Sequence, residues 1–187
     1  QMVRYGVWNG IKYDNTLGND KTPEGLDLKA LMNFNPGNPI DVIIGNAGFL
    51  VFDDSVSLAG VLLRYYEKVS EASCGRCTPC RTRLIELALR DLVEGRGAAV
   101  DWDHIYESAE QMMLTSLCGI GRTAPAAFVG AMKHFRERLF ETAEAMRGDM
   151  FVTITAKCIE ACPAHVNVPR YIDYVRDGHP ELAAGVL

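Results

Sequence analysis

The sequence predicts a mainly α-helical fold, in which a four-helix bundle follows a small irregular or β N-terminal part and precedes a short helical C-terminal segment. Apolar residues recur at helical spacing between residues 53 and 148, whereas residues 1–52 are rich in turn signals. The 187 residues are 48% hydrophobic and 23% charged, which is typical of a globular chain with one domain or two small ones. The expected divisions are 1–52, 53–148 and 149–187.

The N-terminal part is expected to hold short strands separated by turns. Asn9-Gly10 is one of several turn signals, and the one clear strand candidate is residues 40–44. Gly45-Asn-Ala-Gly48 follows this candidate, and a second apolar run covers residues 49–52. A glycine-rich turn between apolar runs can cradle a phosphate, but two glycines without a longer fingerprint favour a plain tight turn.

Four amphipathic helices are expected to form the bundle. In the first, apolar residues recur with the period of one helix face, from Leu58 to Val69. Cap, proline and glycine signals set the limits: the first helix runs from Asp54 or Ser55 to about Ser73, the second from about Pro79 to Gly95, the third opens at Asp101 or Asp103, and the fourth runs from about residue 124 to 147, before Gly148.

The C-terminal part begins after Gly148. Residues 150–155 alternate weakly and predict a strand or an extended linker, and residues 170–177 predict a short helix that Gly178 closes. Because the chain begins with Gln1 and ends at Leu187 without a helix stop signal, we expect it to be a piece of a longer protein.

Charge and hydropathy exclude two classes of function. The net charge is −5, which disfavours nucleic-acid binding, since that needs clustered excess lysine and arginine. No run reaches the roughly 18–20 apolar residues that a membrane span requires, and residues 1–10 lack the basic and apolar blocks of a signal peptide. We therefore expect a soluble protein of the cytoplasm with no membrane span.

The six cysteines are the most informative residues, and their spacing favours metal ligation over disulfides. Three of them stand within seven positions, and a fourth follows 38 residues later: Cys74, Cys77, Cys80 and Cys118, with Cys158 and Cys162 further on. A cubane 4Fe–4S cluster takes one thiolate per iron, so a CxxCxxC loop and one distant cysteine can supply its four ligands. Zinc is the rival, but its sites usually use two separated pairs, and no histidine is near in sequence. Iron held by these thiolates is the favoured metal.

Three arginines stand in or just after the CxxCxxC loop: Arg76, Arg81 and Arg83. A cluster bound by four thiolates is negatively charged, so nearby positive charge would favour its reduced form. The alternative is that these side chains only solvate a helix face.

The first cysteine motif carries a specific resemblance. Glu71-Ala-Ser-Cys-Gly-Arg-Cys-Thr-Pro-Cys-Arg81, with Ser116-Leu-Cys-Gly-Ile-Gly121 downstream, resembles the C-terminal helical domain of the flavoprotein (NADH-binding) subunit of complex I and its relatives, over about residues 45–147. The resemblance implies a helical bundle in which Cys74, Cys77, Cys80 and Cys118 hold a 4Fe–4S cluster that accepts electrons from a flavin. Residues 1–44 lack the family's longer glycine-rich motif, so FAD or FMN and NAD(P) are expected outside this segment.

The tail carries a second resemblance. Residues 156–172, which contain Cys158, Cys162 and Pro163, are similar to the start of the iron–sulfur region in the small subunit of glutamate synthase and related FAD-dependent oxidoreductases. The resemblance implies that Cys158 and Cys162 supply half of a second 4Fe–4S cluster. Two structural cysteines flanking a turn are the alternative, and His165 is expected to be a polar loop residue rather than a ligand.

Together the two resemblances imply an electron-transfer segment of a redox enzyme, without catalytic residues of its own. This order of modules is similar to the beta subunits of NAD(P)-dependent formate dehydrogenases, which implies a molybdo- or tungstopterin catalytic partner and, in addition, a small ferredoxin-like or thioredoxin-like iron–sulfur subunit. A soluble NAD(P)-linked or bifurcating hydrogenase is the alternative complex. A zinc-binding helical scaffold without a redox role is the alternative of a different class.

Overall fold

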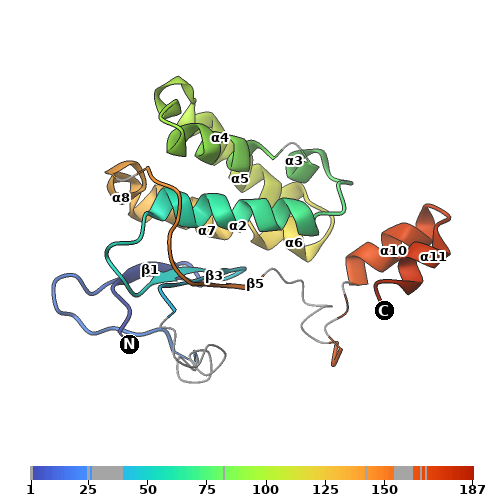
Figure 1. Ribbon diagram of the computed structural model, residues 1–187, viewed down its shortest axis with the longest axis horizontal. Coiled ribbons are helices and arrows are strands. Elements are labelled where there is room, and N and C mark those ends of the chain that lie inside the picture. The colour runs from blue at the N-terminus through green and yellow to red at the C-terminus, as the bar shows by residue number, and fades with distance from the viewer. Residues whose placement is uncertain are drawn as a thin grey trace.

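The computed structural model describes residues 2–24, 26, 40–81, 83–141, 143–153, 162–164, 166 and 168–187. It shows a mainly helical protein with a small mixed sheet, as Figure 1 illustrates. The helices of residues 58–141 lie over one face of the sheet, and two C-terminal helices lie apart from them. The mainly helical class with a small β part is therefore confirmed.

The sheet consists of two hairpins and one late strand. Its order is β2-β1-β4-β3-β5, in which every neighbouring pair is antiparallel except β3 and β5. The strands are β1 (Tyr5–Trp8), β2 (Ile11–Asp14), β3 (Val42–Gly45), β4 (Gly48–Val51) and β5 (Met150–Thr153). The weakly alternating stretch after Gly148 thus forms a strand that pairs with the N-terminal part, and the domain boundaries stay predictions.

Both hairpins have two-residue turns. Asn9 and Gly10 lie at φ 50° and 77° between β1 and β2, which is the left-handed pair that a type I′ turn needs. Asn46 and Ala47 connect β3 to β4, whose ends pair Gly45 with Gly48, so the plain tight turn is confirmed. Short strands were expected in residues 1–52, but they were not located at residues 5–14, although an Asn-Gly step between apolar residues is a strong hairpin signal.

The helices keep the predicted order, but two of them are broken. The second expected helix divides into α3 and α4, and the fourth divides into α7 and α8. The described helices are α2 (Leu58–Ala72), α3 (Thr78–Arg81), α4 (Leu84–Val93), α5 (Trp102–Thr115), α6 (Gly119–Thr123), α7 (Ala126–His134), α8 (Arg136–Glu141), α10 (Val168–Arg176) and α11 (Pro180–Ala184), with a 3-10 turn at Gly97–Ala99.

The caps correct one expectation and confirm another. Ser57, not Asp54 or Ser55, caps α2, because its hydroxyl accepts the Gly60 N–H at 3.2 Å. Asp101 caps α5 by accepting the His104 N–H at 3.1 Å. The expected helix from residue 124 to 147 was wrong. Its main chain departs from helical geometry at Phe135, whose ring packs 5.2 Å from that of Tyr5 in the sheet.

One hydrophobic core joins the sheet to the helices. It includes Val42, Phe49, Leu62 and Phe128, all at most 2% exposed. α7 contacts β1 and β4, α2 contacts β3, and α2, α4, α5 and α7 contact one another in that order. A four-helix bundle stays a prediction, since two of these helices also pack on the sheet. Among the described residues, no helix is long and apolar enough to cross a membrane.

Candidate functional site

Two segments of chain build the cysteine site. α2 ends at Ala72, the chain passes through Ser73 in an extended conformation, and the three-cysteine loop then leads into α3, which carries Cys80. Cys118 occupies the N-cap position of α6. α5 contacts both α3 and α6, so this one helix brings the two cysteine segments together.

The structure brings all four cysteines of the first motif around one pocket. Cys74, Cys77, Cys80 and Cys118 are half-buried, and they line the pocket with Ser73, Arg76, Ile120 and Gly121. The Leu117 N–H donates to Cys77 Sγ at 3.2 Å, which ties the two segments directly to each other. Cys162 is also half-buried, but it does not line this pocket.

The pocket between the thiols is small. Its volume is about 10 Å³, which is close to the space of a single water molecule. A larger group therefore needs the cysteine loop to widen. Gly75 lies at φ +76°, and apart from its chain neighbours no atom of the described residues lies within 4 Å of the place where a Cβ would stand, so the loop has open space on that side.

Burial and neighbouring sulfurs determine the acidity of Cys80. Burial is the largest influence and raises the pKa of this thiol, while a hydrogen bond with Ser73 lowers it and the nearby Cys118 and Cys77 raise it. Without a bound group the thiol therefore stays protonated at neutral pH. Metal ligation reverses this, since a metal binds the thiolate and releases the proton.

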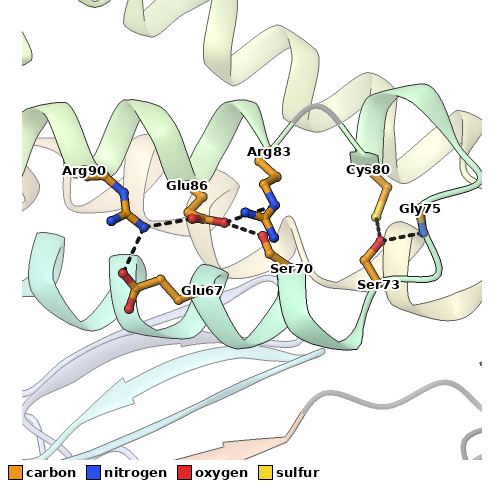
Figure 2. Close-up of polar contacts among 8 residues, drawn as sticks. All are labelled: Glu67, Ser70, Ser73, Gly75, Cys80, Arg83, Glu86 and Arg90. Atoms are coloured by element: carbon orange, nitrogen blue, oxygen red, sulfur yellow. Dashed lines mark hydrogen bonds and ion pairs between the residues drawn. The ribbon is translucent and has the colours of Figure 1, made fainter.

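Ser73 lies between the main chain of the loop and Cys80, as Figure 2 shows. Its Oγ accepts the Gly75 N–H at 3.2 Å and lies 3.2 Å from Cys80 Sγ. Ser73 lies within the predicted cysteine motif, but the spacing of the cysteines did not indicate a function for it. Its position directly before Cys74 in the sequence is the signal that could have identified it as a hydrogen-bonding residue of the site.

A buried carboxylate stabilises the turn that follows Cys80. The Glu86 side chain is 6% exposed and accepts hydrogen bonds from Ser70 and from Arg90, the latter at 2.9 Å. It also lies 3.9 Å from Arg83, which adopts a left-handed φ of 55° between α3 and α4. Figure 2 shows this chain of contacts between α2 and α4. Sequence reasoning missed Glu86, because a glutamate in an amphipathic helix usually faces solvent.

Two of the three arginines in or just after the loop, Arg76 and Arg83, face carboxylates. Arg76, between Cys74 and Cys77, forms an ion pair with Asp177 at the end of α10, and it lowers the pKa of that carboxyl chiefly by hydrogen bonding. Arg83 faces Glu86. These partners offset part of the positive charge, so the expected effect of the arginines on reduction is weakened.

A second serine near the pocket has a different environment. In the described part of the chain, the buried Oγ of Ser116 has no hydrogen-bond partner, and the residue is 1% exposed. A Cβ added at Gly121, which lines the pocket, would lie 2.5 Å from this oxygen and 3.8 Å from Cys80 Cβ. Ser116 thus packs directly behind the pocket wall.

The described residues include no group of three or more His, Cys, Asp or Glu side chains that could hold a metal ion as they stand. The four thiols instead line one pocket together, and a multi-iron cluster needs several separate thiolates because each iron binds its own. Cys158 and His165 lie outside the described residues, so the pairing expected for Cys158 and Cys162 stays a prediction.

The comparisons with known proteins point to one family. Residues 60–142 match the iron-sulfur binding region of NADH-ubiquinone oxidoreductase F. The NADP(+)-dependent formate dehydrogenase subunit beta of Moorella thermoacetica is 27% identical over 99% of this chain and 32% of its own length. The F 2 subunit of the NADH-quinone oxidoreductase of Rhizobium meliloti is 31% identical over 67% of this chain and 30% of its own length.

A third relative is the NADP-reducing hydrogenase subunit HndC of Solidesulfovibrio fructosivorans, which is 29% identical over 75% of this chain and 26% of its own length. This chain thus spans about a third or less of the relatives it matches. All three relatives are subunits of NAD(P)-linked oxidoreductases, and the family match covers both cysteine segments. Residues 60–142 of this chain therefore belong to the family of iron-sulfur binding regions of NADH-ubiquinone oxidoreductase F.

Proposed function

We propose that Cys74, Cys77, Cys80 and Cys118 hold one 4Fe–4S cluster, through which the chain transfers electrons. The observation that carries this proposal is the convergence of four half-buried cysteines, from segments 38 residues apart, on one pocket inside the family region. Four cysteine thiolates are the usual ligand set of such a cluster.

The surroundings of the pocket support the fit. Two groups stand within hydrogen-bond distance of the candidate ligand sulfurs: the Leu117 N–H and the Ser73 hydroxyl, each at 3.2 Å. The unpaired Ser116 hydroxyl also lies next to the pocket wall. A buried hydroxyl without a partner costs about 1–3 kcal/mol, and sulfur acceptors in a widened pocket would offset that cost.

The proposed role is a one-electron relay. A bound cluster would accept and release one electron at a time, whereas NAD(P)H gives up a hydride, so a flavin has to divide the electron pair first. We place the flavin, FAD or FMN, and the NAD(P) site outside residues 1–187. Because the four cysteines are half-buried, a bound cluster would remain accessible to a neighbouring module.

For the whole complex, we propose an NAD(P)-dependent formate dehydrogenase in which this chain is part of the beta subunit. The support is the Moorella relative, whose alignment includes the C-terminal segment as well as the helical domain. The catalytic partner would then be a molybdo- or tungstopterin subunit, with a ferredoxin-like or thioredoxin-like iron–sulfur subunit beside it. An NAD(P)-linked hydrogenase is the second candidate, supported by the Solidesulfovibrio relative.

We also propose that Cys158 and Cys162 supply two ligands of a second 4Fe–4S cluster. The chain has six cysteines, of which the first site uses four. The other two ligands of a second cluster would therefore come from outside residues 1–187. Free thiols and oxygen-sensitive clusters suit a reducing compartment, which supports a cytoplasmic location.

Metal analysis separates this function from a zinc scaffold. Protein purified without oxygen should be brown, with broad absorption near about 400 nm that dithionite bleaches, as expected of iron–sulfur clusters. A colourless protein that contains zinc and no iron would overturn the proposed function.

A further inference from the structure

We propose that Ser73 is a positioning residue that raises the reduction potential of the cluster by donating a hydrogen bond from its hydroxyl to the Cys80 thiolate. The inference rests on the proposed function, because it concerns one of the four proposed ligands. It goes beyond the ligand set, since it assigns control of the electron affinity of the site to a residue that binds no iron.

The geometry fixes the direction of the hydrogen bond. Ser73 Oγ lies 3.2 Å from Cys80 Sγ, and either atom could donate when the thiol is protonated. A sulfur bound to iron is a thiolate and can only accept. Ser73 Oγ already accepts the Gly75 N–H at 3.2 Å through one lone pair, and its hydroxyl hydrogen is available to donate to the sulfur.

The position of Ser73 at the end of α2 helps to maintain this hydrogen bond. Ser73 is the C-cap residue of α2, with an extended backbone at φ −69° and ψ 134° directly after the last helical residue, Ala72. The end of a long, core-packed helix therefore anchors its backbone on one side, before the exposed part of the loop begins. Figure 2 shows Ser73 between Gly75 and Cys80 at this helix end.

The hydrogen bond acts more strongly on the reduced state. Reduction adds one electron and no proton to the cluster with its thiolates, so the negative charge on the sulfurs increases. A hydrogen bond to a more negative acceptor is stronger, and hydrogen bonds to the sulfurs are among the factors that set cluster potentials. The Leu117 N–H does the same for Cys77, but a side-chain substitution cannot remove it.

The test is a redox titration of the purified chain, in which EPR follows the reduced cluster. In Ser73→Ala the equilibrium constant for reduction should fall on the order of tenfold, which is a midpoint about 59 mV lower for a one-electron couple. Ser73→Thr keeps the hydroxyl and should stay close to the wild-type midpoint. A Ser73→Ala midpoint equal to that of the wild type, at full iron content, would overturn the inference.

Ser70→Ala is the matched control. Ser70 stands one helical turn before Ser73 on α2, and its hydroxyl donates to Glu86 instead of to a sulfur. Its loss should leave the midpoint unchanged. A shift in Ser70→Ala as large as that in Ser73→Ala would mean that any lost polar group near the loop changes the potential, and this would count against a specific role of Ser73.

Two further outcomes have defined meanings. If Ser73→Ala does not retain its cluster, resonance Raman spectra of the wild-type protein in H₂O and D₂O replace the titration: exchange of the hydroxyl proton has to shift the iron–thiolate stretching bands, and bands that do not move overturn the inference. If the wild-type protein contains no iron at all, the proposed function fails. A full cluster with an unchanged midpoint in Ser73→Ala refutes the inference alone.

Discussion

Replacing Gly121 with alanine should weaken both the fold and the cluster site. The added Cβ would lie 2.5 Å from Ser116 Oγ and 2.6 Å from Ser116 Cβ, about 1 Å closer than ordinary van der Waals contact. Ser116 cannot easily move away, because its N–H donates to Met112 at 3.1 Å and its carbonyl accepts from Arg122 at 2.8 Å. The strain therefore falls on α6, which begins next to Cys118.

Overpacking of this kind costs about 1–3 kcal/mol. For a chain of this length each kcal/mol lowers the melting temperature by about 2–4 °C, so Gly121→Ala should lower it by roughly 2–12 °C. Iron retained after desalting should fall as well, because Cys118 is displaced from the other three thiols. Thermal unfolding followed by circular dichroism and iron analysis of the same samples provide the two measurements.

Two companion variants test the reasoning. Ser116→Gly removes both clashing atoms, so adding Gly121→Ala to it should cost much less than the same change in the wild type. Gly185→Ala is the matched control, since Gly185 has φ −72° and an added Cβ would meet nothing closer than 3.5 Å. A Gly121→Ala protein with wild-type melting temperature and iron content would refute the packing argument.

Three other substitutions or assays test separate parts of the account. Cys77→Ser should lose iron or convert the cluster, because an alkoxide is a poor substitute for a thiolate ligand, and a full complement of iron and sulfide in this variant would argue against the ligand assignment. Arg76 lowers the pKa of Asp177 from its ordinary value of 3.8, so their contact should contribute stability above that pH and lose it as the pH falls through the lowered pKa; NMR titration should show this pKa rising in Arg76→Gln, and an unchanged value would exclude the contact. Residues 1–187 alone should not oxidise NAD(P)H, and turnover without an added flavoprotein would contradict the relay model.

The candidate site was predictable because local spacing carries it. A CxxCxxC loop holds three thiols within seven residues, and Cys118 follows 38 residues later, at the start of α6. What spacing cannot show is how α5 contacts α3 and α6 to bring these pieces together. The roles of Ser73 and Glu86 likewise depend on burial and direction, which exist only once α2 and α4 are packed.

The fold was predictable where periodicity is strong and less so where tertiary contacts override it. Helix periodicity located α2 and α5, and the Asp101 cap was correct. The fourth helix ends early because the chain has to return to the sheet: the Glu144 N–H donates to Ser57 Oγ at 3.3 Å, and β5 then pairs with β3 in parallel. Neither contact can be predicted from the local sequence, since the paired residues lie about a hundred positions apart.

An EPR spin count on the dithionite-reduced protein, taken with iron and sulfide analysis of the wild type and of Cys118→Ser, tests the proposed cluster most directly. We expect about four irons and one unpaired-electron signal per site of four cysteines, with both lost or reduced in Cys118→Ser. A wild-type protein without this signal, or a Cys118→Ser protein with an unchanged signal and iron content, would contradict the assignment of Cys74, Cys77, Cys80 and Cys118 as the ligands of a 4Fe–4S cluster.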